Sequence, residues 1–172
     1  KSKYEWIAFL DGDDLWHKDK LKIVKEKILK FKNKNFFIHW EKFILLNNTV
    51  AILKNGRTNN LNNISKDLYR ANFFSTSAVV LNKKIIENFI FNESLQNAQD
   101  YEFWLKISKN IKDLTIKKVL GYYIERKENI TSRSYYKKLP ALIYICFKYM
   151  KYDLNFFIFK LIKTIFSLNW FR

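Results

Sequence analysis

Three aspartates near the start of the chain have the spacing of a cation-binding motif. Asp11, Asp13 and Asp14 surround Gly12 directly after the apolar segment 6–10. Residues two positions apart in an extended chain point the same way, so Asp11 and Asp13 can face one point. Carboxylates this close repel each other unless a cation lies between them, and Mg²⁺ or Mn²⁺ prefers such oxygen ligands. The spacing therefore predicts a Mg²⁺ or Mn²⁺ site held by Asp11 and Asp13.

A purely structural interpretation of the same acids stays open. Asp11 would end the strand, and Asp13 or Asp14 would cap the helix that follows, because a carboxylate accepts from the free N–H groups of a helix start. Capping explains one or two acids, but not three at the end of an apolar strand. His17 and His39 lie too far apart to form a zinc pattern, and His39 is expected to be a half-buried strand residue.

Hydrophobic periodicity predicts an α/β chain around these acids. A helix is expected over 17–32, with Leu21, Val24, Ile28 and Phe31 at helical spacing. Residues 55–63 are expected to form a polar loop. The predicted strands are 6–10, 36–46, 49–53, 73–81 and 115–124, and further helices are predicted at 64–71, 83–88, from 100 onwards, at 141–152 and at 154–170.

The segment 5–21, EWIAFLDGDDLWHKDKL, resembles the metal-binding segment of inverting family 2 glycosyltransferases. In that family, which has the GT-A fold, an apolar strand ends in Asp-x-Asp-Asp before an aromatic residue and a helix. The resemblance implies an α/β fold with a GT-A-like mixed sheet flanked by helices. It also implies that the chain is the C-terminal part of the catalytic domain, because the nucleotide-binding strands normally precede this motif. We expect a partial glycosyltransferase domain over 1–134 and a basic amphipathic helical tail over 135–172.

A second part of the resemblance follows later in the chain. A hydroxyl-led strand, a short helix and the run 91–95 (FNESL) lead to Gln99 and Asp100, which precede aromatic residues. At this place the family carries the aspartate that acts as general base, so the resemblance implies that Asp100 is catalytic. The alternative is that Asp100 simply caps the helix that it opens. The order of the two parts is more specific than either part alone.

The resemblance also implies the donor contacts. Asp11, Asp13 and Asp14 would bind the donor, and the loop at 126–132 resembles the family's loop after its last strand. Lys127 stands where the family usually has a histidine. A charged lysine cannot ligate a metal ion, but it can pair with a phosphate, so Arg126 and Lys127 are predicted phosphate contacts.

These features together predict a metal-dependent glycosyltransferase of the hexosyltransferase type. The donor would be a nucleotide-sugar, with a UDP-sugar expected first. The acceptor would be a hydroxyl of a glycan or a lipid-linked molecule, as in lipopolysaccharide or capsule assembly, and transfer would invert the anomeric centre. We expect the isolated 172 residues to be inactive, because the half that binds the base is missing.

Composition keeps a second class of function open. The net charge of +16 attracts polyanions, so the alternative is a basic, aromatic module that binds nucleic acid or a membrane surface without catalysis. The sequence lacks a recognition-helix pattern and a ribonucleoprotein motif, which disfavours nucleic acid. The single cysteine, Cys146, excludes an internal disulfide and fits a cytoplasmic protein.

The tail at 135–172 has two open interpretations. It holds seven Lys or Arg and one acid, Asp153, among many aromatic and aliphatic residues, and Pro140 is expected in the first turn of its first helix. Such helices can lie on an anionic membrane, which would make the protein peripheral on the cytoplasmic face of the inner membrane. Alternatively, they cover the sheet of their own domain or the missing half of that domain.

Overall fold

The computed structural model describes residues 2–45, 47, 49–56, 63–125 and 135–166, which fall into two compact units. The first unit comprises 1–60, 73–88 and 110–127, and the second comprises 61–72, 89–109 and 128–172. The functional division into 1–134 and 135–172 stays a prediction.

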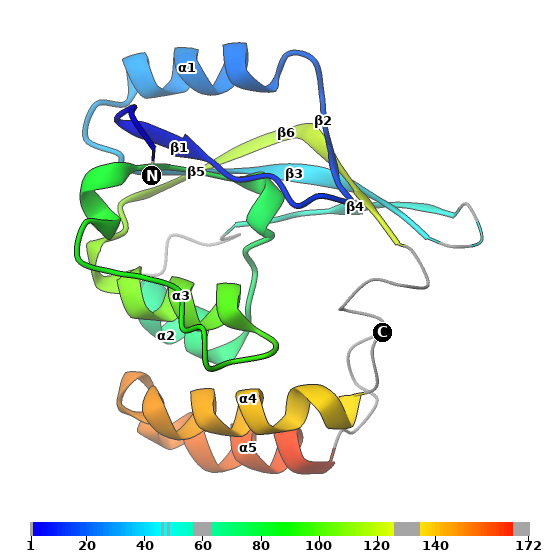
Figure 1. Ribbon diagram of the computed structural model, residues 1–172, viewed down its shortest axis with the longest axis vertical. Coiled ribbons are helices and arrows are strands. Elements are labelled where there is room, and N and C mark those ends of the chain that lie inside the picture. Colours follow the sequence, from blue (N-terminus) through cyan, green and yellow to red (C-terminus); the bar gives the residue numbers. More distant parts are fainter. Residues whose placement is uncertain (1, 46, 48, 57–62, 126–134, 167–172) are drawn as a thin grey trace. The chain divides into compact units, whose positions relative to one another are not determined.

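A mixed six-stranded sheet forms the centre of the first unit (Figure 1). Its order is β1-β5-β3-β6-β2, and β4 pairs with β3. The β3–β6 pair is parallel, and the other pairs are antiparallel. The strands are β1 Trp6–Ala8, β2 Leu15–Trp16, β3 Phe36–Ile44, β4 Val50–Leu53, β5 Val79–Asn82 and β6 Asp113–Ile124.

Helices complete both units and confirm the predicted α/β fold with a mixed sheet flanked by helices. The first unit contains α1 Lys20–Lys30 and the 3₁₀ turns η1 Thr76–Ala78 and η2 Lys83–Ile86. The second unit contains α2 Ile64–Arg70, α3 Gln99–Ile107, α4 Tyr135–Lys148, η5 Met150–Tyr152 and α5 Leu154–Phe166, and the short turn η3 Ser108–Asn110 follows α3.

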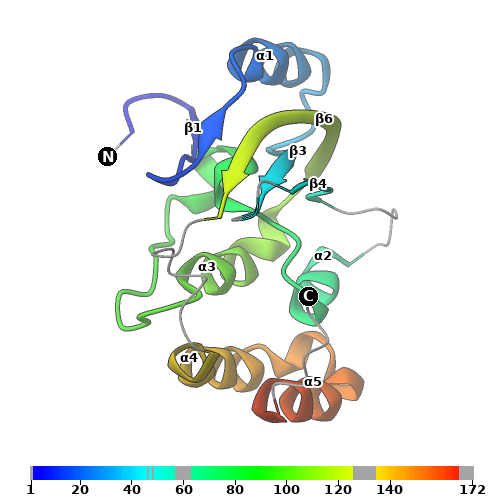
Figure 2. The same cartoon turned by 90° about the vertical axis from the view of Figure 1, so that its right-hand side faces the viewer.

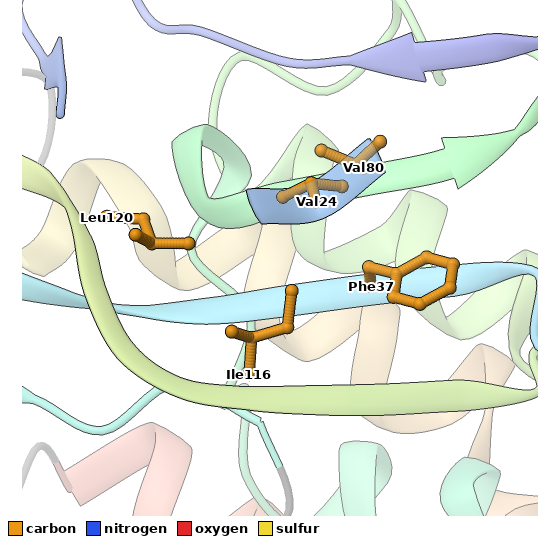
Figure 3. Packing of buried hydrophobic residues seen from close by; sticks show 5 residues of the cluster. All are labelled: Val24, Phe37, Val80, Ile116 and Leu120. Carbon is orange, nitrogen blue, oxygen red and sulfur yellow. The ribbon is translucent and has the colours of Figure 1, made fainter. Parts of the chain in front are cut away.

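Helix α1 covers one face of the sheet (Figures 1 and 2). Its Val24, only 2% exposed, packs against a cluster contributed by three strands, namely Phe37, Val80, Ile116 and Leu120 (Figure 3). The prediction that Leu21 faces this core is wrong, because Leu21 is 57% exposed. Lys20 takes the buried position one residue earlier, and neighbouring helical residues point about 100° apart.

The predicted polar loop at 55–63 begins inside the protein rather than at its surface. Asn55 and Gly56 are both buried, and residues 57–62 lie outside the described part. Gly56 has a φ of 88°, a region that favours glycine, and a Cβ there would overlap the side chain of Thr115. The close approach of Gly56 to β6 therefore explains why this turn is buried.

Helices α4 and α5 lie side by side in the second unit (Figures 1 and 2). Helix α4 begins at Tyr135, so Pro140 lies in its interior and not in its first turn as predicted. Proline has no N–H, so the helix forgoes one backbone hydrogen bond there. Cys146 is fully buried. Within the described part of the chain, no helix has the length and apolar character needed to cross a membrane.

Candidate functional site

The aspartate motif, residues 11–14, forms a turn directly beyond β1. The Asp14 N–H donates to the Asp11 carbonyl over 3.2 Å, and this bond closes the turn. Asp11 is exposed and Asp13 is half-buried. Gly12 stands in open space, because a Cβ at this position would meet no atom within 4 Å. The turn therefore leaves room for a ligand beside Asp11 and Asp13.

Asp14 has a different environment from the other two acids. Its side chain is buried, and Oδ1 accepts from the Ile124 N–H at 3.4 Å, at the end of β6. The capping interpretation of Asp13 and Asp14 is wrong, because β2 intervenes and Asp19 occupies the N-cap position of α1. Asp14 thus joins the motif to the sheet, which leaves Asp11 and Asp13 as the candidate ligands.

The donor set suits Mg²⁺ or Mn²⁺. Both candidate ligands are carboxylates at an open turn, and hard divalent cations take oxygen ligands while keeping positions for water and substrate oxygens. In the residues that the structure describes, no three His, Cys, Asp or Glu side chains gather into a metal-binding group. Two protein ligands, completed by substrate and water, therefore fit this site better than a closed structural site.

Ser77 of η1 holds the chain on both sides of the motif. Its Oγ accepts from the Asp11 N–H at 3.0 Å. Its carbonyl accepts from Trp16 Nε1 at 3.2 Å and from Lys20 Nζ at 2.6 Å. Ser77 is fully buried, so these bonds are shielded from water. One residue thus fixes the start of the motif, the strand that follows it and the start of α1.

A cluster of buried charged and polar side chains adjoins this anchor. Lys20 and Glu41 are both fully buried, and Asn55 Nδ2 donates to Glu41 Oε2 at 2.8 Å. The Lys20 ammonium lies 3.9 Å from the centre of the Trp16 ring. Burial lowers the pKa of Lys20 to about 7, against the opposing effect of the Glu41 and Asp14 carboxylates. Burial also raises the pKa of Glu41.

A register irregularity opposite residues 39–41 shapes the same cluster, and its extra residues belong to β6, since His39, Trp40 and Glu41 pair with Ile116, Val119 and Gly121. His39 is fully buried and not half-buried as predicted, because its edge of β3 is covered by β6. Its Nδ1–H donates to the Trp40 carbonyl at 2.9 Å, and burial, with Lys20 nearby, lowers its pKa to about 4. Gly121 of β6 makes room here, since a Cβ would lie 3.1 Å from Glu41 Oε1.

Sequence reasoning missed these buried polar residues, although two of them carried a signal. Lys20 precedes Val24 by four residues, which places both on one helix face. Glu41 follows Phe37 by four residues in a strand, so both share one face of the sheet. Asn55 carried no signal, because it begins a stretch rich in turn-forming residues.

Asp100 lies in the first turn of α3, in the second unit. The predicted helix is confirmed, and the N-cap position belongs to Ala98, which makes no side-chain cap bond. Asp100 is therefore not the N-cap residue, but it lies in the first turn, where a carboxylate favours the positive end of the helix dipole, so a structural role at the helix start stays open. Ala98 has a φ of 55°, which is uncommon for a residue other than glycine, so the backbone turns sharply just before Asp100. Such strained positions concentrate at functional sites.

The helix that carries Asp100 is anchored on a neighbouring helix. Tyr101 is buried, and its OH lies 2.8 Å from the Leu68 carbonyl and 3.1 Å from the Tyr69 carbonyl of α2. The Tyr101 ring therefore fixes the rotation of α3 about its axis. Asp100 is half-buried one residue before this anchor.

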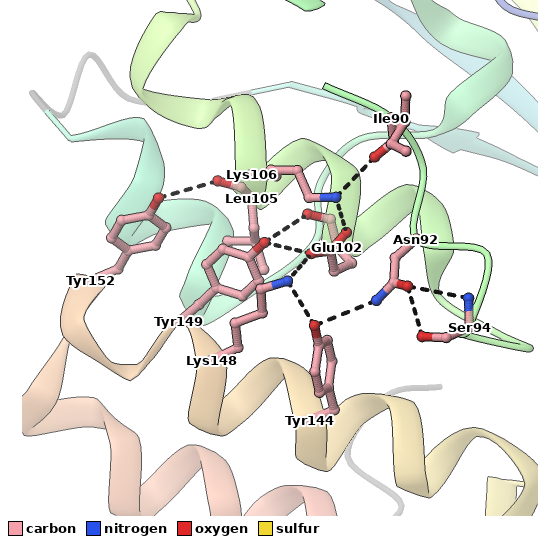
Figure 4. Close-up of polar contacts among 10 residues, drawn as sticks. All are labelled: Ile90, Asn92, Ser94, Glu102, Leu105, Lys106, Tyr144, Lys148, Tyr149 and Tyr152. Carbon is pink, nitrogen blue, oxygen red and sulfur yellow. Dashed lines mark hydrogen bonds and ion pairs between the residues drawn. The ribbon is translucent and has the colours of Figure 1, made fainter. Parts of the chain in front are cut away.

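A second anchor joins α3 to α4 through Glu102, whose side chain is fully buried (Figure 4). Its Oε1 accepts from Lys148 Nζ at 2.8 Å and from the Tyr149 OH at 2.7 Å. Its Oε2 pairs with Lys106 Nζ at 3.1 Å. Burial opposes ionisation of Glu102, but these three hydrogen bonds outweigh it and lower the pKa.

Two predicted features have no description in the structure. Arg126 and Lys127, the predicted phosphate contacts, lie outside the described residues. Asp100 belongs to the second unit and the aspartate motif to the first. That Asp100, Asp11 and Asp13 act on one substrate, as the resemblance implies, therefore stays a prediction.

Comparisons with known proteins agree on the general class. No family model matches the chain. An uncharacterized glycosyltransferase of Methanocaldococcus jannaschii, MJ1057, is 26% identical over 141 residues, which cover 78% of this chain and 47% of the relative. The chain thus spans about half the length of the curated relative that it matches.

Solved structures share the fold. Residues 1–349 of S. aureus TarS superpose with a TM-score of 0.60 and 16% identity, over 98% of this chain and 49% of that one. A second TarS structure gives the same score and identity over 97% of this chain and 29% of its own length. The chain therefore has the fold of part of TarS, and its sequence is similar to that of a glycosyltransferase.

Proposed function

We propose that the protein is a metal-dependent glycosyltransferase of the inverting family 2 type, with the GT-A fold. The observation that carries this proposal is the pair of carboxylates, Asp11 and Asp13, at an open turn whose backbone is fixed to Ser77. The similarity to MJ1057 supports sugar transfer as the reaction class. The donor is a nucleotide-sugar, with UDP-sugars to be tested first, and the acceptor is a glycan or lipid-linked hydroxyl.

In this proposal the residues of the motif have separate roles. Asp11 and Asp13 hold Mg²⁺ or Mn²⁺, and Asp14 keeps the turn attached to β6. The bound ion would supply a Lewis acid and a counter-charge for the departing diphosphate. Arg126 and Lys127 contact the phosphates as fixed positive charges.

Asp100 is the proposed general base. It accepts the proton of the acceptor hydroxyl as that oxygen attacks the anomeric carbon from the side opposite the diphosphate, which inverts the configuration. Such a base contributes about 10²–10⁴-fold to the rate. The two anchors of α3, through Tyr101 and Glu102, fix the helix that carries Asp100.

Substitution of Asp100 tests the proposal in the full-length protein. With a panel of UDP-hexoses, we expect Asp100→Asn to lower kcat by about 10²-fold or more while the donor KM changes little. Asp67→Asn is the matched control, because Asp67 is also a half-buried acid in the first turn of a helix of the second unit. Near-normal turnover by Asp100→Asn would remove this residue from the mechanism, and metal-independent or absent sugar transfer by the wild type would refute the function.

The tail helices favour a membrane-associated enzyme. Helix α4 buries Ala141, Ile145 and Cys146 within its own unit. Helix α5 instead exposes large apolar side chains along one face, at Leu154, Ile158, Phe159, Ile162, Ile165 and Phe166. The chain carries a net charge of +16, which complements anionic lipid. We propose that this face of α5 lies on the anionic cytoplasmic surface of the membrane.

Vesicle binding tests this placement. Full-length protein should co-sediment with phosphatidylglycerol vesicles at low salt, and Ile158→Asp should weaken binding by about tenfold, since burial of one such side chain contributes about 1.5–3 kcal/mol. Leu29→Asp on α1 is the control, because Leu29 is 62% exposed and Ile158 is 67% exposed. Equal vesicle binding by the two variants would refute the placement. The placement would also be refuted if the wild type bound no vesicles but self-associated, and Ile158→Asp abolished that self-association.

A further inference from the structure

Lys20 is a buried cation that the proposed mechanism does not use. Its side chain is fully buried at the start of α1, nine residues after Asp11. Burying an ammonium costs free energy unless its donors are satisfied, and a hydrophobic residue of similar size often serves stability equally well. Stability alone therefore does not require a lysine at this position.

The contacts of Lys20 lead directly to the aspartate motif. Its Nζ donates to the Ser77 carbonyl at 2.6 Å, and the Ser77 Oγ accepts from the Asp11 N–H at 3.0 Å. The Trp16 ring packs against the ammonium and donates to the same carbonyl through Nε1. Lys20 thus contacts the residue that accepts the hydrogen bond of the Asp11 backbone N–H.

Two buried acids near Lys20 favour its protonated form, against the burial that lowers its pKa to about 7. Asp14 and Glu41 are buried, and both raise the pKa of Lys20 by attraction. His39, the other titratable group nearby, is neutral at pH 7 because its pKa is about 4. Lys20 is thus a buried basic side chain whose pKa is raised by both acids and lowered by burial, and such a perturbed pKa is typical of functional sites.

We infer that Lys20 is a positioning residue for the metal and diphosphate site, and that it acts by fixing Ser77 and through it the backbone of Asp11. This inference rests on the proposed function. The inference predicts the direction in which metal affinity changes when Lys20 is replaced, because a positive charge acting only through space would repel a divalent cation. Loss of that charge would then tighten metal binding, whereas loss of positioning weakens it.

Two variants of the full-length protein separate these outcomes. Lys20→Met keeps most of the length of the side chain. We expect it to weaken Mn²⁺ binding, titrated by electron paramagnetic resonance with UDP present, and to raise the Mn²⁺ concentration for half-maximal sugar transfer, each by about tenfold, the effect of one lost charge-assisted hydrogen bond. Ser77→Ala removes the acceptor of the Asp11 N–H. It should weaken Mn²⁺ binding and raise the Mn²⁺ requirement by about threefold, within the range of a neutral hydrogen bond. The acceptor KM should change in neither variant. The double variant should show less than the product of the two shifts, because both act on one contact chain.

The control is Lys25→Met, at an exposed position of the same helix, which should behave as the wild type. An unchanged or lower Mn²⁺ requirement in Lys20→Met would overturn the inference, and if that variant does not fold, an unchanged requirement in Ser77→Ala would do so. A wild-type protein that transfers sugar without any metal would refute the proposed function itself, which is a separate result.

Discussion

Each unit of the molecule buries one glutamate against lysine, and the two arrangements differ. In the second unit, Glu102 accepts from Lys148 and Tyr149 and pairs with Lys106, and its pKa is lowered. In the first unit, Glu41 accepts from Asn55 and Ser75, and burial raises its pKa against the effect of these bonds. Glu102 is therefore held as a satisfied anion, whereas ionised Glu41 is costly to the fold.

The polar atoms near Glu41 extend this difference. Within the described residues, Glu41 Oε1, His39 Nε2 and Glu102 Oε2 are buried without a hydrogen-bond partner, but Glu102 Oε2 forms an ion pair with Lys106 Nζ at 3.1 Å. An unsatisfied buried polar atom costs stability. The lysines that face Glu102 are partly exposed, whereas Lys20 beside Glu41 is fully buried. The second unit thus uses the ion pairs of Glu102 to fix a helix. The first unit instead keeps buried ionisable groups, Lys20 and Glu41, whose charged forms are disfavoured by burial, beside the aspartate motif.

Breaking the network of ion pairs and hydrogen bonds around Glu102 should lower the free energy of unfolding more than the other substitutions below. Glu102→Gln removes the anion that faces three donors, and loss of one partner of a buried pair costs about 3 kcal/mol. Urea unfolding of the full-length protein measures this change in the free energy of unfolding. Glu26→Gln, at an exposed position of α1, should change it by less than about 0.5 kcal/mol. A loss below about 1 kcal/mol for Glu102→Gln would remove the distinction between the two glutamates.

The contribution of Glu102 should depend on pH. The pKa of Glu102 falls below 4.5 on folding, so in acid the unfolded chain binds more protons than the folded chain. The stability difference between wild type and Glu102→Gln should be complete at pH 7 and shrink as the pH falls through the lowered pKa. Urea unfolding between pH 7 and pH 3 checks this, and a difference that grows in acid would contradict the assignment.

Glu41→Gln should change the free energy of unfolding least, and this change should depend on pH in the opposite sense to that of Glu102→Gln. The raised pKa means that the folded chain holds the Glu41 proton more tightly, so ionisation costs stability as the pH rises above 4.5. Glutamine keeps an acceptor for Asn55, while Lys20, Asp14 and neutral His39 remain around it. We expect equal stability of wild type and variant near pH 4 and a gain of up to about 1 kcal/mol for the variant at pH 7. A loss of similar size would show that Lys20 and Glu41 form an ion pair as favourable as that of Glu102.

The sequence predicted the long periodic elements well, but the strand predicted at 73–81 is wrong over 73–78, because Thr76–Ala78 form the 3₁₀ turn η1 and β5 begins at Val79. The strands at 36–44 and 113–124 and the helix from Gln99 lie within a few residues of their predicted positions. The errors fall where tertiary contacts override the local pattern. Leu21 gives up the buried face to Lys20, and Asn55 is drawn inside by contacts with Glu41 and His39.

The candidate site was less predictable than the fold. Local spacing marked Asp11 and Asp13, which the turn leaves accessible, but it could not show that Asp14 turns inward to β6. The role of Ser77 depends on contacts more than 50 residues apart in the chain, with Lys20 57 residues away and Asp11 66 residues away. No local pattern encodes such contacts.

Direct measurement of metal binding tests the central proposal. Free Mn²⁺ can be followed by electron paramagnetic resonance while it is titrated into full-length protein with UDP present. We expect one bound Mn²⁺ for the wild type and for Asp19→Asn, and at least about tenfold weaker binding for Asp13→Asn, which loses one of two carboxylate ligands. Equal binding of Mn²⁺ by Asp13→Asn and the wild type would contradict the assignment of Asp11 and Asp13 as the metal site.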